Sequence, residues 1–230
     1  MGAARRAGRI VGVLIIIQMV GGGMVNFALE APLFGAPGFL LDAASHSQQL
    51  GLAVLLGLIT EALWVGIAIT AFPVFVRRTR TMALWFFALA VVILAVAVLE
   101  NASVMSMVSL SEVYTKTSTA EREQLQVVKI VVASARNWAH YMARIFDGSA
   151  IFVFYVVLYR YALVPRALAG FGVIAVTLML TAVAMPLFGY GVAFSMLAPL
   201  GLSQLILAVW LITKGFRGPP SPGSIQATSD

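Results

Sequence analysis

Long apolar segments separated by short polar connections divide the chain. The segments cover residues 9–29, 50–76, 82–110, 138–159, 168–188 and 192–213. Each is long enough for the roughly 20 residues with which an α-helix crosses the hydrocarbon core of a bilayer. The pattern predicts an all-α polytopic membrane protein with six transmembrane helices.

Basic residues collect at one end of the predicted helices. Arg77, Arg78 and Arg80 follow the second segment, and Arg160 and Arg166 follow the fourth. The same side receives the basic residues near the termini, namely Arg5, Arg6, Arg9, Lys214 and Arg217. By the positive-inside rule we expect both termini to be cytoplasmic.

The composition excludes a soluble domain. The chain is 61% hydrophobic and 10% charged, whereas soluble domains are about half apolar and a quarter charged. It has no cysteine, so disulfide and thiolate chemistry are excluded. The net charge of +6 is sorted among loops and does not form one basic face, so the expected partner is the lipid bilayer and not nucleic acid.

Two connecting segments and the C-terminal tail complete the predicted layout. Ser118 and Glu121 have capping-box spacing, which predicts an outer amphipathic lead-in to the fourth helix over 119–136. Helix breakers follow Lys214, so we expect one membrane domain over 1–217 and a disordered cytoplasmic tail over 218–230. The apolar loop over 30–49 is either a plain interfacial loop or a lid over an outward-facing cavity.

Ionisable residues inside the spans mark the candidate site. His140, Arg144 and Asp147, spaced by four and three residues, share one face of the fourth helix. A charge at mid-bilayer costs about 2.5–3.5 kcal/mol on insertion scales, so such groups normally face partners, water or a ligand. Further polar residues at middle or outer depth are Glu61, Glu100, Asn101 and Gln204. Together they predict a polar pocket that opens outward.

The charges leave several functions open. Glu61, Glu100 and Asp147 stand against the single arginine Arg144, so a proton, ion or cationic ligand is needed to balance them. One hypothesis is binding or proton-linked movement of a small solute or ion. The alternative is an accessory or regulatory subunit that packs on another membrane protein and uses the charges only structurally. An intramembrane enzyme ranks third, and we assign no catalytic residue.

Metal and haem chemistry have weak support. The chain has two histidines, His46 and His140. A site at His140 and Glu100 needs a borrowed third ligand, and bis-histidine haem ligation requires His46 to be held by a loop. We expect no metal and no cofactor.

Several motifs together resemble the bacterial membrane family called domain of unknown function 4386. They are the 9–14 stretch RIVGVL, the 99–101 stretch LEN, His140 ahead of an apolar helix, the 164–170 stretch VPRALAG and the 207–215 stretch LAVWLITKG. The resemblance implies a six-helix protein of the bacterial cytoplasmic membrane and implies no activity. Similar proteins often carry an arginine and a glutamate where this chain has Ala97 and Gln204, which suggests a rearranged ion pair.

Overall fold

The computed structural model describes residues 2–217, apart from the side chains of residues 119–121. Within these residues six helices are long and apolar enough to cross a membrane. These candidate spans are Ala3–Leu29, Ser47–Phe75, Arg80–Lys116, Arg122–Arg160, Arg166–Phe188 and Phe194–Lys214. The predicted all-α class is confirmed, and the number of candidate spans equals the predicted six, while the predicted tail over 218–230 lies outside the described residues.

Eight α-helices and three short irregular helices build the described chain. The spanning helices are α1 (Ala3–Met24), α4 (Ser47–Phe75), α5 (Arg80–Lys116), α6 (Thr119–Arg160), α7 (Arg166–Ala184) and α8 (Ala198–Lys214). The π-helix η1 (Val25–Leu29) prolongs α1, and the 3₁₀ turns η2 (Met185–Phe188) and η3 (Phe194–Met196) lie between α7 and α8. Two one-turn helices, α2 (Ala31–Phe34) and α3 (Phe39–Asp42), occupy the connection between α1 and α4.

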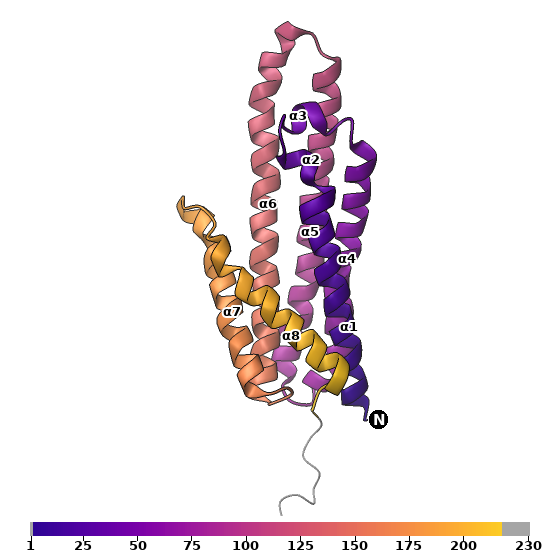
Figure 1. Cartoon of the computed structure of the whole chain (residues 1–230), viewed down its shortest axis with the longest axis vertical. Coiled ribbons are helices and arrows are strands. Elements are labelled where there is room, and N and C mark those ends of the chain that lie inside the picture. Colours follow the sequence, from indigo (N-terminus) through magenta and orange to yellow (C-terminus); the bar gives the residue numbers. More distant parts are fainter. Residues whose placement is uncertain (1, 218–230) are drawn as a thin grey trace, which may run out of the picture.

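The spanning helices form a closed ring in which each helix packs on the next. The order is α1, α4, α5, α6, α7 and α8, and α8 returns to α1. Arg5 Nε donates to the Lys214 carbonyl at 3.1 Å, so both described ends of the chain lie at one end of the ring. We call this the terminal end, and the opposite end, where α5 turns into α6, the hairpin end (Figure 1). The cytoplasmic position of the terminal end stays a prediction from its positive charge.

The α5–α6 hairpin is longer than a bilayer requires. With 37 and 42 residues, these helices measure about 55 and 63 Å, against a hydrocarbon core of about 30 Å. Figure 1 shows the hairpin rising well past α7 and α8. The predicted lead-in is the first part of one continuous α6 with Ser118 as its N-cap residue, and α5 continues to Lys116, beyond the predicted end at 110.

The connection between α1 and α4 packs on the hairpin as an ordered cap. We call residues 30–46 the cap segment. Leu33, Phe39 and Leu40 are buried in a small apolar core with residues of α5. The Ser111 hydroxyl donates to the Leu40 carbonyl at 3.0 Å and accepts from the Ala44 N–H at 2.9 Å. These contacts hold the cap segment against α5.

The terminal half of the ring is filled by apolar side chains. Phe75 packs its ring near those of Phe86, Phe154 and Phe216, with centroids 5.7–6.0 Å apart. Tyr155 adds one polar contact, its hydroxyl lying 2.8 Å from Ser203 Oγ.

Close packing between α6 and α7 predicts a sharp effect at Gly172. A Cβ atom there would overlap the ring of Tyr155, which is fully buried. We expect Gly172→Ala to destabilise the protein by about 1–3 kcal/mol, the usual cost of overpacking, and to lower the thermal unfolding midpoint in detergent. Gly51→Ala in α4 is the control, because a Cβ there meets open space. Equal midpoints for the two variants would contradict this packing.

Candidate functional site

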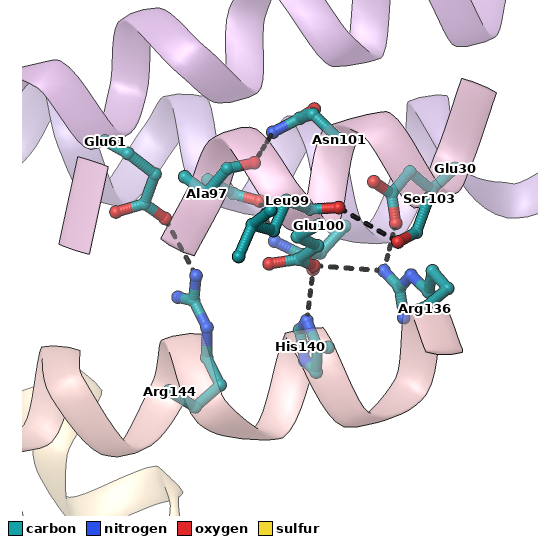
Figure 2. Close-up of polar contacts among 12 residues, drawn as sticks. Glu30, Glu61, Ala97, Leu99, Glu100, Asn101, Ser103, Arg136, His140 and Arg144 are labelled. Carbon is teal, nitrogen blue, oxygen red and sulfur yellow. Dashed lines mark hydrogen bonds and ion pairs between the residues drawn. The ribbon is translucent and has the colours of Figure 1, made fainter. Parts of the chain in front are cut away.

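One face of α6 carries a row of ionisable side chains that meets carboxylates from three other segments. We call this set the charge ladder. It comprises Glu30, Glu61, Glu100, Arg136, His140, Arg144 and Asp147. Figure 2 shows Arg136, His140 and Arg144 pointing from a single helix toward the facing carboxylates. Their spacing of four residues produces this alignment, because residues four apart lie above one another on a helix.

The part of the ladder nearer the hairpin end, which we call its outer part, lies beneath the cap segment. Arg136 Nη2 donates to Glu30 Oε2 and lies 3.4 Å from Glu100 Oε1. The same Glu100 oxygen is 2.7 Å from His140 Nδ1, so Glu100 contacts both the Arg136 and the His140 side chains. The ring of Phe34 stacks over the Arg136 guanidinium, with the central carbon 4.7 Å from the ring centroid. Glu30 and Arg136 are thus almost fully buried.

The inner part of the ladder is centred on one arginine. Arg144 Nη2 donates to Glu61 Oε1 at 2.8 Å, and its Nη1 lies 2.6 Å from Asp147 Oδ2. The other oxygens of these carboxylates, Glu61 Oε2 and Asp147 Oδ1, are buried without a hydrogen-bond partner in the described chain. Buried polar atoms are normally satisfied by protein or water, so these oxygens are the natural positions for a proton, a water molecule or a cation.

The ladder has more carboxyl groups than basic side chains. Its carboxylates are Glu30, Glu61, Glu100 and Asp147, and its permanent cations are Arg136 and Arg144. With all four carboxyl groups ionised, even a protonated His140 leaves one negative charge to be balanced by a proton or a cation. The predicted excess of carboxylates is therefore present. Compared with the prediction, the ladder has one more carboxylate, Glu30, and one more cation, Arg136.

Glu30 is the ladder residue that lies outside the candidate spans. Burial raises the pKa of Glu30, and the nearby Glu100 adds to this rise, while Arg136 opposes it. Glu30 therefore accepts a proton more readily than an exposed glutamate. Its protonation weakens its attraction for Arg136, which is then left to Glu100.

A small polar pocket lies beside the ladder, between α1, α4, α5 and α6. Its volume is about 30 Å³, and its lining includes Glu30, Glu61, Glu100, Asn101 and Arg144. A water molecule needs at least about 10–15 Å³ of such space, and organic ligands occupy pockets of about 300–1,000 Å³. The pocket therefore fits a water-sized occupant. Asn101 Nδ2 donates to the Ala97 carbonyl at 2.8 Å, which leaves its side-chain oxygen available.

Gln204 is separated from the other predicted site residues. It lines a second cavity, of about 330 Å³, on the side of α6 that faces α7 and α8. His140, Tyr141 and Arg144 line this cavity too, amid largely apolar residues. The structure thus brings Glu61, Glu100, Asn101, His140, Arg144 and Asp147 together and leaves Gln204 across Arg144 from the polar pocket.

Two ladder residues, Glu30 and Arg136, were missed from the sequence and assigned only to outer connections. Arg136 had a usable signal, because it lies four residues before His140 and extends the same helical face. Glu30 had none, because its partner lies 106 residues further along the chain.

The histidines do not meet in a common site. His46 Nδ1 lies 3.2 Å from Asp42 Oδ1 within the cap segment, whereas His140 pairs with Glu100. In the described part of the chain no group of three His, Cys, Asp or Glu residues is arranged to hold a metal ion.

A ring of six candidate spans around a buried charge cluster defines a multi-pass helical membrane protein. The chain belongs to the family described as Domain of unknown function (DUF4386), whose model matches residues 10–215. No curated protein and no solved structure matches it. The family resemblance read from the sequence is confirmed. Ala97 and Gln204, the positions at which the resemblance implied a rearranged ion pair, line the two cavities that share Arg144.

Arg144 gives a direct test of the inner ladder. Arg144→Met leaves Glu61 and Asp147 buried without their cation, and breaking a buried pair in this way costs about 3–5 kcal/mol. We expect a lower thermal unfolding midpoint, with partial recovery at low pH, where protons neutralise the carboxylates. Adding Glu61→Gln and Asp147→Asn to Arg144→Met is expected to restore most of the loss. Arg80→Gln, an exposed arginine on α5, serves as the control, and an Arg144→Met midpoint equal to the control would refute the pairing.

Proposed function

We propose that the protein binds a proton or a small monovalent cation in the polar pocket and exchanges it with the solution at the hairpin end. The observation that carries this proposal is the unbalanced negative charge of the ladder around a pocket of about 30 Å³. An excess carboxylate buried in an apolar bundle is stable only when a proton or cation neutralises it.

The volume of the polar pocket and the side chains that line it limit which ligands can bind there. Glu61, Glu100 and Asn101 offer carboxylate and amide oxygens, the ligands that hard cations prefer. Thr60, whose hydroxyl donates to the Leu56 carbonyl at 2.6 Å, adds an oxygen with free lone pairs. An organic solute does not fit in this space. Of the small solute or ion suggested by the sequence, we therefore propose only the ion.

The ladder supports a proton route from the hairpin end. Carboxylates and basic side chains alternate from Glu30 through Arg136, Glu100 and His140, and chains of carboxylates and histidines act as proton relays in membrane carriers. Toward the terminal end, the described residues of the core around Phe75 and Phe154 include no charged side chain. Uptake and release on the hairpin side therefore need only a movement of the cap segment, whereas passage across the membrane requires a second conformation.

Cation and proton dependence of stability tests this proposal. The thermal unfolding midpoint is measured across a pH series and in sodium, lithium or choline chloride at equal ionic strength. A bound ion is expected to stabilise the wild type by about 2.7 kcal/mol at a hundredfold excess over Kd. Glu61→Gln is expected to abolish most of this response, because it removes a charge and a ligand oxygen.

Glu112→Gln is the matched control, since Glu112 is an exposed carboxylate near the hairpin end of α5. A wild-type protein that responds to neither pH nor cation identity would favour the accessory-subunit alternative, in which the ladder only fixes the packing of the helices. A response that survives in Glu61→Gln would move the binding site away from the pocket.

A further inference from the structure

A second, unrelated cavity lies at the terminal end of the ring. Its volume is about 350 Å³, within the range of small-molecule sites. Its walls come from the start of α1, the end of α4, the turn between α6 and α7, and the residues after α8. Four segments that are distant in the sequence therefore meet around one space.

The rim of this cavity is strongly basic. Arg77, Arg78 and Arg217 line it, and none of the described lining residues is acidic. The guanidinium groups of Arg77 and Arg78 make no hydrogen bond or ion pair with the described chain, so their donors are free for a ligand. Arg217 is positioned by its own backbone, whose N–H donates to the Leu163 carbonyl at 2.8 Å, and its guanidinium carbon lies 5.9 Å from the Trp210 ring.

The floor of the cavity is apolar. Ala7, Pro73 and Leu163 are among its lining residues, and Leu163 belongs to the main hydrophobic core. A free, fully hydrated anion gains nothing from such a floor. A molecule with an anionic head and an apolar body satisfies both parts of the lining.

We propose that this cavity binds the phosphate headgroup of an anionic phospholipid. A guanidinium presents a planar fork of donors that matches two phosphate oxygens, and basic pockets between transmembrane helices on the cytoplasmic side hold anionic lipid headgroups. The predicted cytoplasmic position of the terminal end brings the cavity to the leaflet where such lipids act on basic residues. The proposal is independent of the ion site, since the charge ladder lies in the opposite half of the ring.

A bound headgroup would stabilise the closure of the ring. Residues from both described ends of the chain line the cavity, and α1 packs on α8 directly beside it. The close approach is visible at Gly8, where a Cβ atom would overlap the backbone of Gly215 and Phe216. A ligand that binds only the folded state stabilises it by an amount that grows with the logarithm of the free ligand concentration above Kd, so we expect the unfolding midpoint to rise with the concentration of anionic lipid.

The test titrates the detergent-solubilised protein with phosphatidylglycerol, with phosphatidylcholine and with inorganic phosphate. Native mass spectrometry counts bound lipid, and the unfolding midpoint reports stabilisation. We expect phosphatidylglycerol to bind and stabilise, and the other two to have little effect. Stabilisation by inorganic phosphate to the same extent would overturn the lipid assignment, as would equal binding of phosphatidylcholine.

Two variants that lose the same number of positive charges distinguish a specific lipid site from general attraction of anionic lipid to a basic surface. One variant replaces Arg77, Arg78 and Arg217 with Gln, and the control replaces Arg6, Arg80 and Arg166, which are exposed basic residues outside the cavity lining. We expect the first to lower phosphatidylglycerol affinity at least tenfold and the control to change it little. Equal losses in both would overturn the proposal. The single variant Arg78→Gln repeats the comparison against Arg80→Gln if the first triple variant does not fold.

Discussion

Charges buried in an apolar bundle have to be paired, and this requirement orders most of the structure. The basic side chains of α6 find their carboxylates on three other segments: Glu30 after η1, Glu61 on α4 and Glu100 on α5. Each contact fixes α6 at one height against a different neighbour. Buried ion pairs give little net stability because desolvation offsets their attraction, but a mispaired register leaves a charge uncompensated and is strongly disfavoured. The ladder therefore selects one packing of these helices.

The cap segment and the long hairpin follow from the same pairing. Arg136 lies toward the hairpin end of the ladder, where the ring of Phe34 and the carboxylate of Glu30 cover it. The apolar contacts of Leu33 and Phe39 with α5 hold this cover in place. The cap thus covers the charges at the hairpin end of the ladder, where the proposed ion exchange would take place.

The two halves of the ring have opposite chemistry. The hairpin half contains the ladder and the polar pocket, while the terminal half is packed with aromatic and aliphatic side chains and is basic only at its surface. Arg144 stands between the polar pocket and the larger apolar cavity that contains Gln204. In this chain the arginine is held by Glu61 and Asp147.

Local sequence properties determined the helical class, the six spans and the shared face of His140, Arg144 and Asp147. Hydropathy and the helical period depend on neighbouring residues, so they can be read without knowing the fold. Tertiary structure alone decided that Glu30 meets Arg136, that Gln204 lies apart from the carboxylates, and that the pocket has room only for a water-sized occupant. These features depend on how helices distant in the sequence rotate and tilt against one another. That choice is made by packing and charge pairing across the whole ring, because no single segment contains both partners.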